Sequence, residues 1–348
     1  MKTISILLLT AVCFFISCSD DNESLLKNDL IKKTMAPAIA GEKIDFAYAI
    51  GTLSGKLATA QAEASIAGAA GTGFEWYSYY TASNEITVDG TRYPGGSEVP
   101  VKSVKETSTS GAVSTATLED KIDEVYMNPS VPHGTRMVDL IAVTLRYSYI
   151  VPAEAKGQKV SFVFSAKSST GESVSYKTPE YNVSKMDMKR LIPLTTANVC
   201  YFSIENMAAY TLAEVNSQNL SDKIDFIYIH QAKLDNFDYG HAFVSPGTDP
   251  KYIATPNVIP GNWTKNSTRM EKRADVRDAQ LKGSIPNVYI DDIDFQTLQL
   301  DQAYDFVLNF AADEGAFMKT ANGKYAAYVY INRLATGTVT VSIKRYPL

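Results

Sequence analysis

The chain has 348 residues, of which 45% are hydrophobic and 20% charged, and its net charge at pH 7 is −5. This length favours two globular domains, and the negative charge argues against a surface that binds nucleic acid. Tyrosine supplies 21 residues, and a tyrosine-rich composition is typical of β-strands and of exposed faces that make contacts.

Residues 1–17 are predicted to form a signal peptide that is removed on export. Lys2 gives the positive start, and the apolar run that follows is shorter than the ~20 residues that span a bilayer. This run ends in FISC, which resembles the lipobox of bacterial lipoproteins, although Phe15 stands where leucine is usual. We predict that Cys18 becomes the first residue and carries acyl chains. The alternative is an ordinary signal peptide in which this cysteine occurs by chance.

Residues 18–40 are predicted to be a lipid-anchored tether. The acidic run SDDNE follows Cys18, and such polar, charged sequence is typical of disordered chain. The run is also similar to the export signal of surface lipoproteins in Bacteroidota, which implies exposure on the outer face of the outer membrane. No second apolar run approaches membrane length, so we expect the rest of the chain to be held at the membrane by lipid.

From residue 41 onwards, apolar and polar residues alternate, which predicts β-strands. In KIDFAYAI, residues 43–50, Ile44, Phe46 and Tyr48 fall on one face and Asp45 falls on the other. Similar alternation occurs over residues 143–151, 159–167, 303–310, 325–331 and 338–346.

Helices are predicted to be few. Thr211 and Glu214 fit a capping box at the start of a short helix that ends near Gln218. Residues 267–282 show no strand alternation and contain many helix formers, which favours a second helix. Their mixed charges indicate a solvated face rather than an anion site.

A near-copy of KIDFAYAI, KIDFIYIH, occupies residues 223–230. We interpret the two copies as equivalent core strands in two domains of one architecture. Short strands with frequent turns, and no regular alternation of strands with helices, favour β-sandwiches. The sequence therefore predicts an all-β chain of two tandem immunoglobulin-like β-sandwich domains, over residues 41–187 and 188–348.

The stretch GFEWYSYYT, residues 73–81, has the strongest binding character. If its Phe74 face enters the core, Tyr77 and Tyr79 remain on the other face, where flat aromatic rings stack on sugars or hold peptide side chains. A second candidate is the loop PGNWTKN. The predicted ligand-binding residues are Trp76, Tyr77, Tyr79, Tyr80 and Trp263. The alternative is core packing with ordinary aromatics at a sheet edge.

No residue set predicts a reaction, so we expect no catalytic residues, no metal site and no cofactor. The sequence contains no nucleophile elbow. None of the three histidines, His133, His230 and His241, lies in a zinc-binding pattern. Cys200 lies in a strand-like run and is predicted to be a buried thiol. The acidic runs LEDKIDE and YIDDIDF are predicted to lie at solvated strand ends and loops, although carboxylates that meet only in the fold could still hydrolyse glycans.

EKIDFAYAIG, AQAEASIAGAAGTGFE, YSYIVPAEAKGQKVSFVFSAKSSTGESVSYK and YNVSKMDM resemble a Bacteroidota family of surface lipoproteins known only as a domain of unknown function. The resemblance covers roughly residues 28–190. It implies an accessory lipoprotein that binds a glycan or peptide beside a TonB-dependent SusC/SusD-type importer in the outer membrane. The alternatives are a structural, adhesive or lipid-binding surface lipoprotein, and a glycoside hydrolase or peptidase. No catalytic residue transfers from this resemblance.

Overall fold

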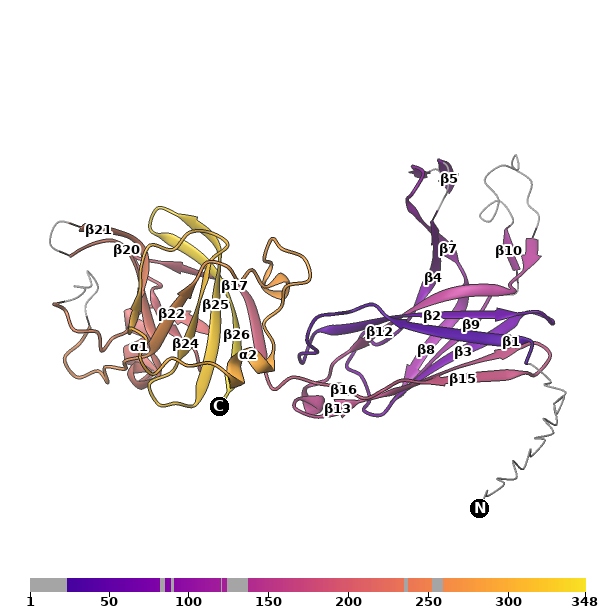
Figure 1. The fold of residues 1–348 in the computed structure, drawn as a ribbon, viewed down its shortest axis with the longest axis horizontal. Coiled ribbons are helices and arrows are strands. Elements are labelled where there is room, and N and C mark those ends of the chain that lie inside the picture. The colour runs from indigo at the N-terminus through magenta and orange to yellow at the C-terminus, as the bar shows by residue number, and fades with distance from the viewer. Residues whose placement is uncertain are drawn as a thin grey trace, which may run out of the picture.

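The computed structural model describes residues 24–81, 85–88, 91–119, 121–123, 137–234, 237–251 and 259–348. Its regular structure is mainly antiparallel β-sheet, arranged in two sandwiches that lie end to end (Figure 1). Among the described residues the only α-helices are the short α1 (Leu212–Ser217) and α2 (Asp292–Gln296). The predicted all-β fold class is confirmed.

The first sandwich consists of two five-stranded sheets and three small strand pairs. Sheet A contains, in spatial order, β1 (Leu26–Lys32), β2 (Lys43–Thr52), β12 (Ala142–Ile150), β4 (Gly73–Thr81) and β7 (Glu98–Lys102). Sheet B contains β15 (Ser173–Lys177), β14 (Phe162–Ser168), β3 (Leu57–Ala64), β9 (Val113–Leu118) and β8 (Val104–Ser110). The small pairs are β5 (Ile86–Val88) with β6 (Thr91–Tyr93), β10 (Lys121–Asp123) with β11 (Met137–Asp139), and β13 (Lys159–Val160) with β16 (Tyr181–Asn182).

The core of the first sandwich follows the alternation of its strands. On β2, Phe46 and Tyr48 are buried, whereas the alternate residues Asp45, Ala47 and Ala49 are partly exposed. The Phe46 ring packs edge-on against Phe162 of the opposite sheet, with ring centroids 4.9 Å apart. Tyr48 packs against Phe164 at 5.2 Å. Buried aromatic side chains of this size contribute most of the apolar area that joins two sheets.

The predicted tether over residues 18–40 is wrong for its second half. β1 pairs antiparallel with β2 from Leu26↔Thr52 to Lys32↔Phe46, so it forms the edge of sheet A. Leu26 is fully buried. The segment is mixed in charge because only one face of an edge strand enters the core, and the outward residues Lys27 and Asp29 hid that alternation.

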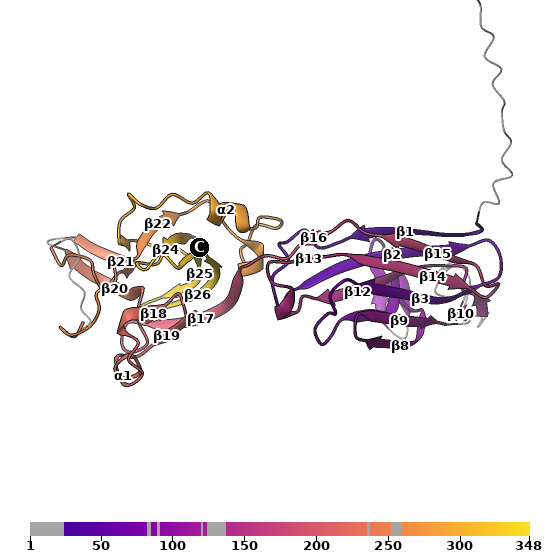
Figure 2. The ribbon, with the colours of Figure 1, turned by 90° about the horizontal axis from the view of Figure 1, so that it is seen from below.

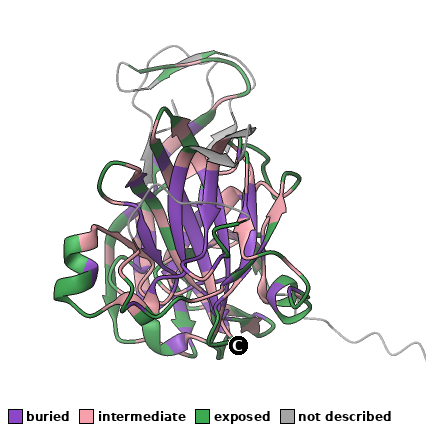
Figure 3. Cartoon of the chain, turned by 90° about the vertical axis from the view of Figure 1, so that its left-hand side faces the viewer, coloured by how far each residue is buried: buried purple, intermediate pink, exposed green. Residues whose placement is uncertain are grey.

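The second sandwich also consists of two five-stranded sheets. Sheet C contains β17 (Asp187–Thr195), β26 (Thr338–Pro347), β25 (Tyr325–Ala335), β24 (Gly315–Lys319) and β22 (Arg269–Arg273). Sheet D contains β19 (Ala208–Tyr210), β18 (Tyr201–Ser203), β20 (Phe226–Leu234), β21 (Phe237–Val244) and β23 (Phe306–Val307). Single turns of 3-10 helix occupy Ser221–Lys223 and Ala279–Leu281, and a similar turn, Ala153–Ala155, follows β12 in the first sandwich. Seen from the end of the molecule, the central strands are buried and the helices and loops around them are largely exposed (Figure 3).

The two helix predictions have opposite outcomes. The Thr211 hydroxyl accepts a hydrogen bond from the Glu214 backbone N–H at the start of α1, so the predicted capping box is confirmed. The helix predicted over residues 267–282 is wrong, because Arg269–Arg273 forms β22 and pairs with β24. Pairing with a neighbouring strand outweighs the weak helix preference of these residues.

The two KIDF copies do not occupy equivalent positions. β2 leads into β3 of the opposite sheet, whereas β20 leads into its own neighbour β21. In the second copy, Asp225 precedes the strand and is buried, whereas Asp45 of the first copy lies within β2 and is partly exposed. The predicted equivalence of the two strands is therefore wrong, although each copy contributes to a core.

The chain passes from β16 directly into β17, and the two sandwiches touch at this crossing (Figure 2). The Arg190 guanidinium donates two hydrogen bonds to the Glu42 carboxylate, at 2.7 and 2.8 Å. The Gln280 amide donates to the Pro37 carbonyl at 3.1 Å. Ile39 is fully buried in an apolar cluster whose other members come from residues 186–346. Apolar and polar contacts together therefore join the two sandwiches.

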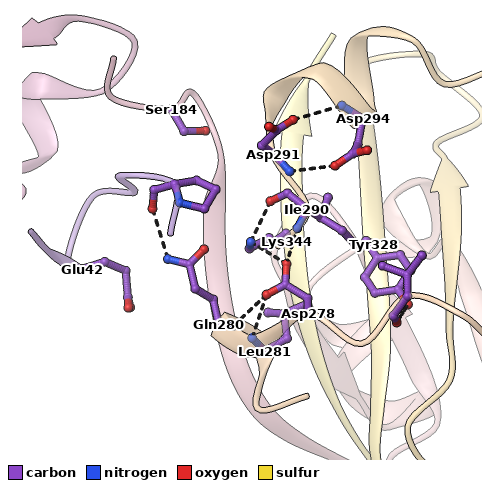
Figure 4. Close-up of polar contacts among 12 residues, drawn as sticks. Glu42, Ser184, Asp278, Gln280, Leu281, Ile290, Asp291, Asp294, Tyr328 and Lys344 are labelled. Carbon is purple, nitrogen blue, oxygen red and sulfur yellow. Dashed lines mark hydrogen bonds and ion pairs between the residues drawn. The ribbon is translucent and has the colours of Figure 1, made fainter. Parts of the chain in front are cut away.

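A buried ion pair holds the loop that lies at this junction (Figure 4). Lys344 of β26 donates to Asp278 Oδ2 at 2.6 Å and to the Ile290 carbonyl at 2.8 Å, and both charged side chains are fully buried. Asp278 also accepts backbone N–H groups of Gln280, Leu281 and Ile290. Burial lowers the pKa of Lys344, and the adjacent Asp278 opposes that effect. The pair fixes residues 278–290 against the outer face of sheet C.

Candidate ligand-binding surface

The predicted tyrosines lie on the outer face of sheet A. β4 pairs with β7 without a register shift, so Tyr77 and Tyr79 share a face and lie opposite Lys102 and Pro100. Tyr77 is 45% exposed, and Tyr79 is half-buried. Phe74 enters the core, where it packs against Tyr147. Strand alternation therefore assigned these three side chains to the correct faces.

Trp76 and Tyr80 are the other two predicted ligand-binding residues of this stretch. Regular alternation would place Trp76 on the core face with Phe74, but this predicted ligand-binding residue is 44% exposed. The pairing of β4 with β12 shifts register between Tyr147↔Phe74 and Leu145↔Ser78, and Trp76 lies in that bulge. A bulge leaves residues unpaired and turns them away from the regular pleat. The side chain of Tyr80 is not among those that the structure describes.

The prediction that Trp263 lies in an exposed binding loop is wrong. Only 6% of this residue is exposed, and its ring packs edge-on against Tyr201 at 5.3 Å. Its indole N–H donates to the Asn216 side chain at 2.8 Å. The turn residues around Trp263 indicated a loop, but they carried no information on the apolar face of sheet D that the ring covers. Trp263 is thus a core residue of the second sandwich.

Small side chains form a low floor in the middle of the outer face of sheet A. Ala47, Ala49 and Gly51 point outward from β2, opposite Arg146, Thr144 and Ala142 of β12. On one side lies β1, and on the other β4 and β7 rise from the sheet and carry β5 at their tip (Figure 1). Small residues between taller walls leave a groove that is open to solvent.

Two hollows lie along this groove and meet at Tyr79. The first has a volume of about 500 Å³ and is lined by Lys27, Asp29, Ala49, Gly51 and Tyr79, among others. The second has a volume of about 380 Å³, and Asp45, Glu75, Glu98 and Arg146 lie around it. Tyr79 and Thr144 line both hollows, so the two form one continuous surface, which we call the sheet A groove.

A cation–π contact lies where the two hollows meet. The Arg146 guanidinium stacks over the Tyr79 ring, 3.7 Å from its centre, and donates to Glu98 Oε2 at 2.7 Å. Partial burial, and then the nearby Glu75 carboxylate, raises the pKa of Tyr79 above its usual value. A tyrosine phenol is neutral near pH 7, and here Glu75 is one acceptor for its hydrogen bond. Sequence reasoning missed Arg146 and Glu98, although Arg146 is the only charged residue of VTLRYSYIV.

The groove offers planar groups, hydrogen-bonding groups and, around its second hollow, the carboxylates of Asp45, Glu75 and Glu98. Among its described lining residues there is no histidine and no cysteine. Cys200, the free thiol of the described residues, is buried in the second sandwich, and burial raises its pKa to about 12. The prediction of a buried thiol is confirmed. Because its pKa is raised, Cys200 does not form the thiolate that a nucleophile needs near pH 7.

The acidic runs have structural roles where they are described. Asp291 caps α2 by accepting the backbone N–H of Ile293, and Asp294 completes the capping box. Asp292 accepts a hydrogen bond from Ser184 at the junction. In the first run, Glu119 pairs with Lys102 at 3.3 Å. No group of three or more potential metal ligands occurs in the described ranges.

Two predictions concern residues that the structure does not describe. Cys18, the predicted lipidation site, and His133 both lie in undescribed segments. Within the described part of the chain, no helix combines the length and apolar character needed to cross a membrane.

Comparisons with known proteins divide the chain where the sandwiches meet. Two family models match, each described as a domain of unknown function: DUF4466 over residues 23–183 and DUF8576 over residues 184–348. A comparison with curated proteins finds no match.

Among solved structures, a DUF4466 family protein from Parabacteroides merdae is 36% identical, with a TM-score of 0.78. The alignment covers 93% of this chain and 99% of that one. AvmM, described as catalysing macrocyclization in alchivemycin A biosynthesis, is 11% identical over 46% of this chain and 89% of that one, with a TM-score of 0.25. BcpA, the major pilin subunit of Bacillus cereus, is 10% identical over 91% and 66%, with a TM-score of 0.23. These last two similarities are too weak to support an argument, whereas the first shows that the chain belongs to the DUF4466 family.

Proposed function

We propose that this protein binds a glycan, without transforming it, in the sheet A groove. The observation that carries the proposal is the stack of Arg146 on Tyr79 between two hollows lined by carboxylates. Flat rings and guanidinium planes pack against the apolar faces of sugars, while carboxylates and hydroxyls bond to sugar hydroxyl groups. Hydrogen-bonding groups around a few aromatic rings are the usual composition of sites that fix the orientation of a polar ligand.

A glycan fits this groove better than a peptide does. A peptide that binds to a sheet usually adds as a strand at an edge, where backbone N–H and C=O groups are free. The groove instead crosses the face of sheet A, where the strands are already paired with each other. The floor between these paired strands consists of small residues such as Ala49, Gly51 and Thr144.

We further propose that the mature protein is a lipid-anchored accessory of an outer-membrane importer of the SusC/SusD type. The FISC motif and the acidic run after Cys18 support the anchor, and the similarity to a Parabacteroides protein supports a source in the same bacterial group. The second candidate is an adhesive or structural surface protein, which the exposed Trp76 and Tyr77 would also suit.

The groove predicts a specific loss of binding. On a glycan array, we expect the full-length protein to bind one group of oligosaccharides, and Tyr79→Ala to weaken the strongest of these at least about tenfold, or about 1.4 kcal/mol. Tyr79→Phe keeps the ring under Arg146 and should retain most of the affinity. The matched control is Tyr176→Ala, which removes an exposed tyrosine from sheet B. Equal binding by the wild type and Tyr79→Ala, or binding to a peptide library alone, would refute a glycan groove.

The anchor has its own test. We expect protease added to intact cells to remove the wild-type protein, and a detergent pull-down from outer membrane to recover a TonB-dependent importer with it. Cys18→Ala should abolish acylation, as followed by a labelled fatty acid, and should release the chain from the membrane. Recovery of the wild-type protein in the soluble periplasmic fraction would contradict the anchor and leave the groove proposal unaffected.

A further inference from the structure

Two histidines lie directly opposite each other on sheet D, in the second sandwich. His230 of β20 pairs in register with His241 of β21. Their ring centroids are 4.4 Å apart and the rings are tilted by 38°. Both residues are partly exposed, so an ion could reach them. Side chains at directly opposed positions of an antiparallel pair have Cβ atoms about 5 Å apart, which allows both imidazoles to bind one ion.

A third residue orients one of the rings. The Tyr228 hydroxyl lies 2.7 Å from Nδ1 of His241, and Tyr228 is fully buried. When Nδ1–H donates to this hydroxyl, the lone pair of His241 is on Nε2, at the far side of the ring. A hydrogen bond from the second ring nitrogen to a fixed partner is the usual outer contact of a metal-bound histidine.

The backbone adds a further observation, since Gln231, immediately after His230, has a φ of 54° within the strand. A residue with a side chain adopts this left-handed conformation at a cost, and such positions occur often at functional sites.

We propose that His230 and His241 form a two-imidazole site for a borderline divalent transition-metal ion such as Zn²⁺ or Cu²⁺, with Tyr228 as its positioning residue. Imidazole ligands favour these ions over Mg²⁺ and Ca²⁺, which prefer oxygen. No third histidine, cysteine or carboxylate joins the pair within the described residues. The protein therefore supplies two ligands, and the remaining coordination positions are open to water or to a second molecule. This site is independent of the sheet A groove, which belongs to the other sandwich.

The test uses full-length protein without a histidine tag, titrated with ZnCl₂ by calorimetry and with CuCl₂ by electron paramagnetic resonance. We expect one ion per chain and, for Cu²⁺, a signal split by two imidazole nitrogens. His230→Gln and His241→Gln should each lower the affinity at least about tenfold and leave at most one nitrogen in that signal. Tyr228→Phe should lower the affinity about tenfold and keep the two-nitrogen signal, because outer contacts typically change affinity 10- to 100-fold.

The control is His133→Gln, which removes the one histidine outside the pair; we expect it to bind like the wild type. The double variant His230→Gln/His241→Gln measures binding elsewhere on the chain. Wild-type protein that binds no more ion than the double variant would overturn the proposal. A two-nitrogen Cu²⁺ signal that survives in His230→Gln would overturn it as well. Because His230 is partly exposed, we expect this variant to fold, so the result can be interpreted.

Discussion

Asp278→Ala is expected to lower the free energy of unfolding by about 3 to 5 kcal/mol, because it leaves the Lys344 ammonium buried without its partner. The substitution also removes the acceptor for three backbone N–H groups, those of Gln280, Leu281 and Ile290. Residues 278–290 should then detach from sheet C. Urea denaturation followed by circular dichroism measures the change.

Two further variants separate the contributions of this pair. Lys344→Met fills a similar volume and leaves Asp278 with its three backbone donors, so it should cost less than Asp278→Ala. Asp275→Ala breaks the exposed pair with Arg273, just before this loop, and should change stability far less, since exposed ion pairs contribute little. If Asp278→Ala matched Asp275→Ala in stability, the buried pair would not be what fixes this loop.

Stability is expected to fall as pH rises from 5 to 8, because of Asp225. This carboxyl is 4% exposed, and burial raises its pKa from 3.8 to about 7, although the Ile204 N–H and the Thr268 hydroxyl donate to it. Between these two values the folded state binds the proton and the unfolded state does not. Stability is therefore lost as the pH rises towards the folded-state pKa, by roughly 4 kcal/mol over the whole interval between the two values and by about 3 kcal/mol of this above pH 5.

Asp225→Asn should remove most of this pH dependence. The amide is always neutral, and it can accept from the Ile204 N–H and donate to the Thr268 hydroxyl, so the hydrogen bonds survive in altered form. Thermal melts at pH 5 and pH 8 compare the two proteins, and Asp222→Asn, at an exposed position nearby, serves as the control. A wild-type melting temperature that rises towards pH 8, or a variant as pH-sensitive as the wild type, would show that Asp225 does not control the pH dependence.

Local alternation predicted the parts of the structure that depend on one strand at a time. It identified the β class and the buried face of β2, and it assigned Phe74, Tyr77 and Tyr79 to their faces. Alternation failed for Trp76, because the bulge depends on the pairing of β4 with β12, and these two strands are far apart in the sequence. An exposed edge strand such as β1 shows a weak pattern for a similar reason, since only one of its faces enters the core.

The candidate site could be predicted only in part, because its second half comes from elsewhere in the chain. Tyr79 stood out as an aromatic on an outward face, but Arg146 acquires its position from the pairing of β12 with β2 and β4. In the sequence, Ala47, Ala49 and Gly51 look like the ordinary solvent-facing residues of a strand, so they did not indicate a groove. Trp263 shows the converse, since turn residues around it indicated exposure and the tertiary fold buried it.

The two tryptophans provide the most direct measurement of the central claim, that a glycan binds in the sheet A groove. Trp76 lies on β4 three positions before Tyr79, which lines the groove, and is 44% exposed, whereas Trp263 is buried in the other sandwich. In Trp263→Phe protein, the emission reports Trp76 alone, and in Trp76→Phe protein it reports Trp263 alone. The ligand is the oligosaccharide that binds most strongly on the array.

We expect this oligosaccharide to change the Trp76 emission in a saturable manner, with the same dissociation constant as calorimetry gives for the wild type. The emission of Trp263 should stay constant over the titration, and Tyr79→Ala should shift the Trp76 curve to at least about tenfold higher concentration. Saturable binding by calorimetry that changes Trp263 and leaves Trp76 unaffected would place the ligand on the second sandwich and contradict the account.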